Sequence, residues 1–165
     1  MRDVLQAEAA LVRGGYPEIS ALLRREIHVD RTFVEFVAFC RARGAAITIV
    51  SSGIEPIVRE RLEEIGVRDV AIVANDIEAD PAGWRIRFRD LAANGTDKEA
   101  LVRAARAAGS RTLFVGDGRS DYAAATAADV RCAKRGYPLE RYLVARGIDF
   151  IPYSTFAELV GVLEL

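Results

Sequence analysis

Apolar residues recur along the chain with two different spacings. Phe33, Phe36, Val37 and Cys40 follow the i, i+3, i+4, i+7 spacing of a helix with one buried face, which ends at Gly44. Short apolar runs follow, separated by further helical patterns: AITIV at 46–50, VAIVA at 70–74, TLFVG at 112–116 and VRCA at 130–133. Strands separated by helix-length crossovers are typical of a mainly parallel sheet covered on both faces. The pattern therefore predicts a three-layer α/β fold.

Local signals place the remaining elements. Asp30 is a candidate N-cap for the helix that ends at Gly44, and Thr96 with Glu99 forms a Thr-x-x-Glu capping box before a helix at 97–108. An Asp-Pro-Ala-Gly centre predicts a β-hairpin within residues 75–88. Helices at 3–13 and 17–27, separated by two glycines, predict an αα-hairpin. The other predicted elements are helices at 54–65, from about 120 and at 138–146, a strand near Phe150, and a last helix capped by Ser154 or Thr155.

Composition limits the classes of function. The 165 residues suit one domain with a small appendage, and a formal charge of −1 gives no general reason to bind nucleic acid or an anionic membrane surface. No apolar stretch approaches the length of a membrane span, and charges interrupt the first residues where a signal peptide needs an apolar core. We therefore expect a cytoplasmic protein, in which Cys40 and Cys132 are buried thiols.

Polar residues gather at three predicted element ends. They are Ser51-Ser52-Gly53 after one strand, Lys98 at a helix start, and Asp117 with Asp121 after another strand. A phosphate group would be served by a hydroxyl with backbone N–H groups, by a lysine, and by a divalent cation on carboxylates. Each also has a structural alternative: a serine can cap the next helix, Lys98 can be a surface residue, and Asp121 a solvated helix-start acid.

These segments resemble a known family. In order, ITIVSSG, TDKEALV and LFVGDGRSD are similar to the second, third and fourth motifs of the haloacid dehalogenase (HAD) superfamily. The resemblance is to its phosphoserine-phosphatase-like branch, which includes the 2-hydroxy-3-keto-5-methylthiopentenyl-1-phosphate phosphatases. It extends to DRTFVEFVAFCRARG, VANDIEADPAGW and the tail from Cys132. It implies a Rossmann-like core over residues 30–165 and a remnant of a helical cap over residues 1–29.

The resemblance also implies an activity. HAD phosphatases are Mg²⁺-dependent and form a phosphoaspartate, so the expected partner is a small phosphorylated metabolite. Ser51 would hydrogen-bond the phosphoryl group, and the backbone at Ser52 and Gly53 would help to cradle it. Lys98 would neutralise the charge of the nucleophile and the phosphate.

The two aspartates form the expected metal site. By the same resemblance, Asp117 would ligate Mg²⁺, and Asp121, assigned to the catalytic and the metal site, would orient Lys98 or a metal-bound water.

One motif of the family is absent from these residues. Its first strand ends in Asp-x-Asp-Gly-Thr, which supplies the nucleophile, and no Asp-x-Asp occurs in the 165 residues. The nearest imitations, at 76–78 and 97–99, lie in the predicted hairpin and beside Lys98. We therefore expect this chain alone to be inactive, either because the true start lies upstream or because activity has been lost.

Two other interpretations remain beside that of a phosphatase. One is a non-catalytic module, or pseudophosphatase, that keeps a Mg²⁺ and phosphate pocket, and the other is a receiver-like or flavodoxin-like domain. Without its first strand, the sheet would expose the strands that end at Ser51 and Gly116. Either these two strands pair directly with each other, or another segment covers them, and a missing N-terminal segment or a second copy of the chain in a homodimer is then the expected partner.

Overall fold

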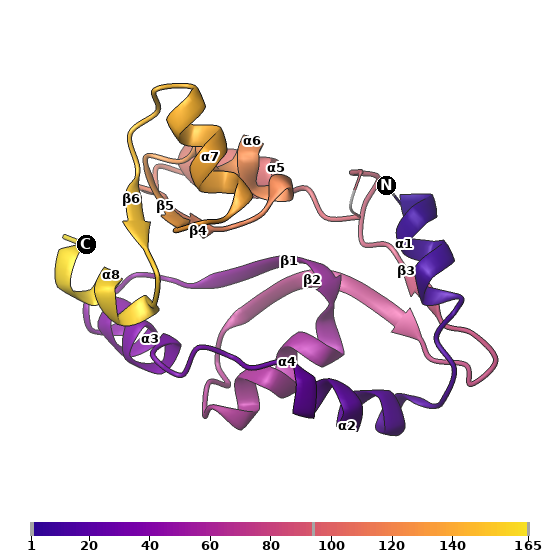
Figure 1. Ribbon diagram of the computed structural model, residues 1–165. Helices are drawn as coiled ribbons and strands as arrows, with labels where there is room; N and C mark the ends of the chain where they lie inside the picture. The colour runs from indigo at the N-terminus through magenta and orange to yellow at the C-terminus, as the bar shows by residue number, and fades with distance from the viewer. Residues whose placement is uncertain (1, 94, 165) are drawn as a thin grey trace. The chain divides into compact units, whose positions relative to one another are not determined.

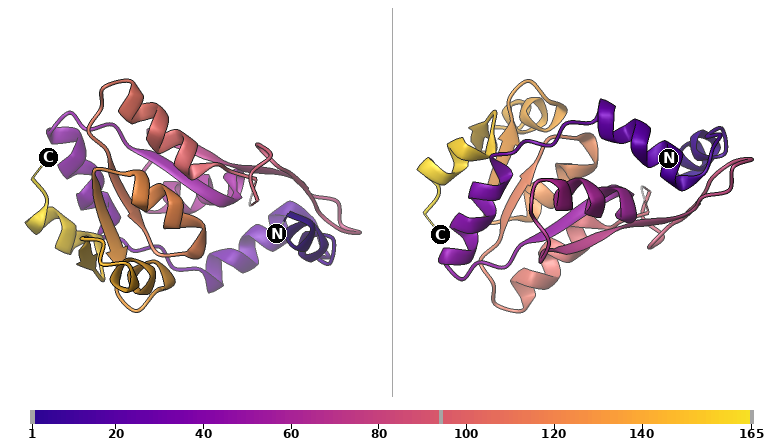
Figure 2. Two further views of the ribbon diagram at one scale, coloured as in Figure 1. Left: turned by 90° about the horizontal axis from the view of Figure 1, so that it is seen from above. Right: turned by 90° about the horizontal axis from the view of Figure 1, so that it is seen from below.

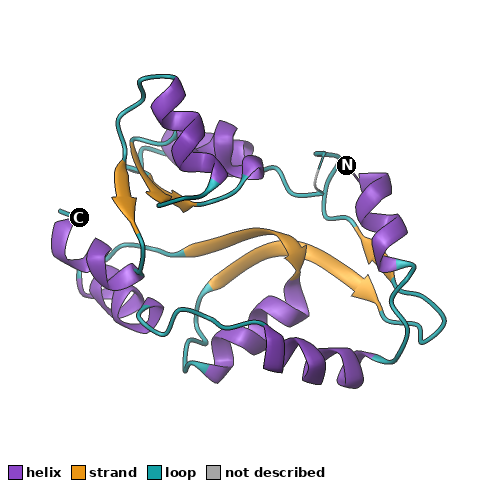
Figure 3. Cartoon of the chain, in the orientation of Figure 1, coloured by secondary structure: helices purple, strands orange, loops and turns teal. Residues whose placement is uncertain are grey.

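Helices and strands alternate along the chain, and this confirms the predicted α/β class (Figure 3). The structure, a computed structural model, describes residues 2–93 and 95–164. The elements are α1 (Arg2–Ala9), α2 (Tyr16–Glu26), α3 (Phe33–Ala42), β1 (Thr48–Ile54), α4 (Glu55–Glu64), β2 (Ala71–Glu78), β3 (Arg85–Arg87), α5 (Lys98–Ala107), β4 (Leu113–Gly116), the 3₁₀ turn η1 (Arg119–Asp121), α6 (Tyr122–Ala127), β5 (Val130–Lys134), α7 (Pro138–Ala145), β6 (Ile151–Tyr153) and α8 (Phe156–Val162).

The chain divides into two compact units, with the boundary between Thr96 and Asp97. Each unit holds a three-stranded sheet, in the order β1-β2-β3 in the first and β4-β5-β6 in the second. Strand β1 pairs parallel with β2, and β5 pairs parallel with both β4 and β6, while β2 and β3 form the predicted antiparallel hairpin. The mainly parallel pairing and the hairpin agree with the prediction. The predicted boundary between a cap remnant and a core near residue 30 falls inside the first unit and stays a prediction.

The third helix shows the buried face that its spacing predicts. Phe33, Phe36, Val37 and Cys40 are all buried in α3. The N-cap position of this helix is Thr32 rather than the expected Asp30, whose carboxylate accepts from the backbone N–H and the hydroxyl of Thr32, at 2.9 and 2.7 Å. The aspartate therefore stabilises the turn that leads into the helix, and the helix begins at Phe33.

The first two helices pack on separate elements, which differs from the predicted αα-hairpin. In Figures 1 and 2, α1 lies beside β3, while α2 runs beside α4. The Gln6 amide accepts from the Ile86 N–H at 3.0 Å and donates to the Trp84 carbonyl at 3.3 Å. Gln6 thus pairs with backbone groups of an edge strand, which a helix-to-helix contact would have left exposed.

The second unit has its own apolar core. Helix α6 packs on β4 and β5, and α7 packs on β5. Ala125, Ala133, Leu139 and Leu143 are fully buried between them. This packing fixes the carboxyl end of β4, where the chain passes through Asp117 and Gly118 into η1.

The cysteine prediction is confirmed, since Cys40 and Cys132 are both buried free thiols. Burial raises the pKa of the Cys132 thiol to about 12. Among residues 2–93 and 95–164, no helix has the length and apolar character needed to cross a membrane.

Candidate functional site

An ion pair joins the predicted lysine to the second predicted aspartate. Lys98 Nζ lies 2.7 Å from Asp121 Oδ1 and donates a second hydrogen bond to Ser120 Oγ at 3.1 Å. The side chains of Lys98 and Asp121 are only 11% and 6% exposed, so little water screens the pair. An ammonium group has three N–H donors, and two are used by these partners in the part of the chain that the structure describes. One donor of Lys98 therefore remains for a bound anion.

The other oxygen of Asp121 holds the loop that follows β4. Asp121 Oδ2 accepts from the backbone N–H groups of Asp117 and Gly118, at 3.0 and 2.9 Å. A Cβ atom on Gly116 would lie 2.7 Å from this oxygen, so only glycine allows the carboxylate to approach the strand end. Both Asp121 oxygens are thus engaged by protein donors. This geometry fits a role in orienting Lys98 better than direct contact with a metal.

Asp117 has the opposite environment. It is exposed at the carboxyl end of β4, and within the described residues its carboxylate has no hydrogen-bond or ion-pair partner. Its backbone carbonyl is fixed by the Leu139 N–H at 2.9 Å, at the start of α7. Mg²⁺ keeps several waters and needs only one or two protein carboxylates, so Asp117 suits such an ion. In the described ranges, no three His, Cys, Asp or Glu side chains gather into a ready metal cluster.

The helix that carries Lys98 begins one residue later than the predicted capping box requires. Asp97 is the N-cap, and its carboxylate accepts from the Ala100 N–H at 2.9 Å. Glu99 instead pairs with Arg103 at 2.6 Å. The stronger acceptor next in sequence replaces Thr96 as the cap, which places Lys98 in the first helical turn.

The predicted phosphate-binding residues Ser51, Ser52 and Gly53 belong to the first unit, at the end of β1 before α4. Gly53 N–H donates to Ser51 Oγ at 3.0 Å. A Cβ on Gly53 would lie 3.2 Å from that oxygen, which is tighter than ordinary contact. Neither serine caps α4 through its side chain, because the N-cap position is Ile54. The capping alternative for Ser51 and Ser52 is therefore wrong.

Two residues near the predicted sites were missed by the sequence reasoning. Ser120 shares the Lys98 ammonium with Asp121, and Asn75 donates to the Ser52 carbonyl at 2.9 Å. The signal for Asn75 was an amide directly after the apolar run of β2. Ser120 gave no signal beyond its place between two motif residues.

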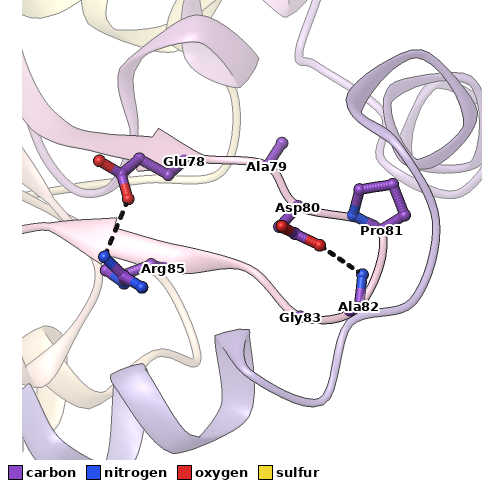
Figure 4. A pocket seen from close by; sticks show the side chains of 7 residues that line it. All are labelled: Glu78, Ala79, Asp80, Pro81, Ala82, Gly83 and Arg85. Carbon is purple, nitrogen blue, oxygen red and sulfur yellow. Dashed lines mark hydrogen bonds and ion pairs between the residues drawn. The ribbon is translucent and has the colours of Figure 1, made fainter.

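A hollow of about 550 Å³ lies away from these residues, at the turn of the β2–β3 hairpin (Figure 4). Glu78 pairs with Arg85 across it at 3.3 Å, and Asp80 accepts from the Ala82 N–H at 2.8 Å. None of the predicted site residues lines this hollow. Its acidic side chains bind neighbouring protein groups, so it does not define a site.

Comparisons with known proteins identify the class of protein to which the chain belongs. The family model of haloacid dehalogenase-like hydrolases matches residues 1–126, and the chain belongs to this family. The predicted resemblance is confirmed.

Three relatives show which members of this family the chain resembles. The chain is 31% identical to Pdp3-interacting factor 1 of Schizosaccharomyces pombe over 96% of this chain and 73% of that protein. It is 27% identical to the polyol phosphate phosphatase PYP1 of Saccharomyces cerevisiae, over 90% and 68% of the two chains. A 2-hydroxy-3-keto-5-methylthiopentenyl-1-phosphate phosphatase of Geobacillus kaustophilus is 29% identical, over 89% and 68%.

A solved structure agrees in fold. A substrate-bound phosphoserine phosphatase complex has a TM-score of 0.75 over 99% of this chain and 77% of that chain, at 20% identity. This likeness confirms the Rossmann-like α/β fold class.

Proposed function

We propose that the chain carries the phosphate-handling and metal-handling parts of a Mg²⁺-dependent phosphomonoesterase. The observation that carries the proposal is the Lys98–Asp121 pair at 2.7 Å, which is anchored to the loop that presents Asp117. A shielded lysine with an unused donor, held in the same unit as an exposed carboxylate, provides a counter-charge for phosphate and a ligand for a cation.

Each residue has a defined part in this proposal. Lys98 offsets the negative charge of a phosphoryl group, and Asp121 fixes the ammonium of that lysine. Ser51 Oγ accepts from the Gly53 N–H and keeps its own proton to donate to a phosphoryl oxygen. Asp117 would hold Mg²⁺, which when bound neutralises charge on the phosphate.

The substrate class follows from the relatives. Two of them are named as phosphatases of small metabolites, a polyol phosphate and a methylthiopentenyl phosphate. A small phosphorylated metabolite is accordingly the proposed substrate.

The missing nucleophile motif leads to a second candidate function. The 165 residues contain no Asp-x-Asp pair, so within them the covalent step has no aspartate of that motif. For these residues alone, the second candidate is a non-catalytic Mg²⁺ and phosphate-binding module.

The test measures hydrolysis and binding in parallel. We expect the chain with Mg²⁺ to hydrolyse p-nitrophenyl phosphate no faster than Asp117→Ala, while inorganic phosphate perturbs the NMR signals of Lys98 in the presence of Mg²⁺. Turnover that Asp117→Ala abolishes would establish an active enzyme and reject the binding-module alternative. Absence of any phosphate binding would reject the proposal itself. An in-frame Asp-x-Asp-Gly-Thr upstream of the Met1 codon would identify the source of the nucleophile.

We also propose a partner for two sheet edges. Within the residues that the structure describes, β1 and β4 are each the outer strand of their own sheet, and such edges attract further strands. A preceding N-terminal segment or a second copy of the chain would cover them. A monomer by light scattering, with both strands strongly protected from hydrogen exchange and not paired to each other, would contradict this. The cytoplasmic location stays a prediction of the sequence.

A further inference from the structure

The end of β1 leaves its ladder with β2 over three residues. Val50 lies opposite Val73 and Ile54 opposite Asn75, so residues 51–53 face a single β2 residue, Ala74. A bulge of this kind leaves backbone groups without their regular strand partners. Those groups need other partners, because unpaired backbone groups are costly away from water.

Side chains from two other segments supply these partners. Thr96 Oγ1 donates to the Ser51 carbonyl at 3.0 Å, and Asn75 Nδ2 donates to the Ser52 carbonyl at 2.9 Å. Asn75 is fully buried and Thr96 is 5% exposed, so water does not compete for either hydrogen bond. The two carbonyl groups are therefore held by hydrogen bonds from buried side chains.

The orientation of the Asn75 amide is fixed as well. Its Oδ1 accepts from the Arg89 N–H at 3.1 Å, which leaves the NH₂ group to face Ser52. Gly95, with φ of +75°, packs so closely that a Cβ would clash with Asn75 Oδ1 and with Phe88. Arg89 and Gly95 thus hold the amide in place.

We propose that Asn75 and Thr96 are positioning residues that hold Ser51–Gly53 in an anion-binding conformation. The inference rests on the proposed function, since the anion is the phosphoryl group. Because the Ser51 and Ser52 carbonyls accept hydrogen bonds from these two side chains, their oxygens cannot turn toward the anion and repel it. The neighbouring Ser51 hydroxyl, which accepts from Gly53 N–H, keeps its proton for the ligand.

The test uses two pairs of variants. Thr96→Val removes the hydroxyl but keeps the shape, Thr96→Ser keeps the hydroxyl, and Asn75→Ala removes the amide. Ser20→Ala is the matched control, because it deletes a side-chain hydrogen bond to Glu60 elsewhere in the same unit. The readouts are amide hydrogen exchange at Ser52 and Gly53, and the Kd for inorganic phosphate with Mg²⁺ by NMR titration.

We expect Thr96→Val and Asn75→Ala each to speed exchange and to raise the phosphate Kd about fivefold or more, the worth of one hydrogen bond. Thr96→Ser should stay within about twofold of the parent protein in both readouts, and Ser20→Ala should stay within about twofold in the phosphate Kd. Unchanged exchange in Thr96→Val, or an equal rise of the phosphate Kd in Ser20→Ala, overturns the inference.

Two further outcomes are also decisive. If the parent protein binds no phosphate, the proposed function fails, and the exchange rates alone decide whether Asn75 and Thr96 hold the segment. If Asn75→Ala does not fold, the Thr96→Val and Thr96→Ser pair decides.

Discussion

Replacing Gly116 by alanine tests whether the Asp121 carboxylate organises the second unit. The added Cβ would lie 2.7 Å from Asp121 Oδ2 and 2.8 Å from Phe114 Cε1. Asp121 is 4% exposed and is held by Lys98 and by two backbone N–H groups, so it cannot retreat without losing hydrogen bonds. Phe114 packs against the core of this unit and is similarly confined.

The expected loss of stability follows from these contacts. Overpacking costs about 1–3 kcal/mol, and one hydrogen bond to a charged group is worth about 1.5–3 kcal/mol. Since moving the carboxylate relieves part of the clash, the two costs do not add fully. We expect Gly116→Ala to lower the free energy of unfolding of the second unit by about 2–4 kcal/mol.

Gly118 provides a matched control two residues away. A Cβ there would lie 3.7 Å from Asp121 Oδ2, which is ordinary contact, and the backbone is extended at φ −97° and ψ 175°. Gly118→Ala should therefore change stability by less than about 0.5 kcal/mol, or raise it by up to about 1 kcal/mol through the unfolded state.

The assay must report on the second unit separately. Trp84 is the only tryptophan and belongs to the first unit, so its fluorescence follows that unit. Native-state hydrogen exchange at Val115 and Cys132, which face each other in the β4–β5 pair, follows the second unit. Equal stability of the two variants would refute the reasoning, because only Gly116→Ala displaces the carboxylate.

Three other predictions concern single side chains. Lys98→Met should destabilise the second unit by about 3 kcal/mol in hydrogen exchange, since it leaves the Asp121 charge buried without its cation; a change below about 0.5 kcal/mol would contradict this. Asp117→Asn should weaken an already poor Mg²⁺ affinity in an NMR titration and leave stability unchanged, and tight binding that survives the substitution would exclude Asp117 as a ligand. The hydrogen bond from Ser20 is the main cause that lowers the pKa of Glu60 below 4.5, so its stabilisation is present above pH 4.5 and lost as pH falls through the lowered pKa. Ser20→Ala should therefore unfold at a lower urea concentration than the parent protein near neutral pH, as measured by tryptophan fluorescence. This difference should shrink in acid, and a difference that does not shrink would show that Glu60 is not involved.

The sequence by itself determined the local elements and the types of residue at their ends. Helix α3, the hairpin and the strands at Val50 and Val115 follow from periodicity and turn residues, which act over a few positions. The order of Ser51, Lys98 and Asp117 along the chain was enough to indicate the family. These features depend on neighbours in sequence, so no tertiary contact was needed to predict them.

Tertiary structure decided which partner each polar group has. Asp121 holds Lys98 across 23 positions of sequence, and Thr96 reaches Ser51 across 45. The same holds for Gln6, which bonds to the backbone of Trp84 and Ile86 in the part of the chain where α1 packs on β3. Such contacts form only when distant segments bury their apolar faces together and leave polar groups that must find a partner. Local sequence patterns show which polar groups need a hydrogen-bond partner, and the packing of the whole unit determines which groups pair with each other.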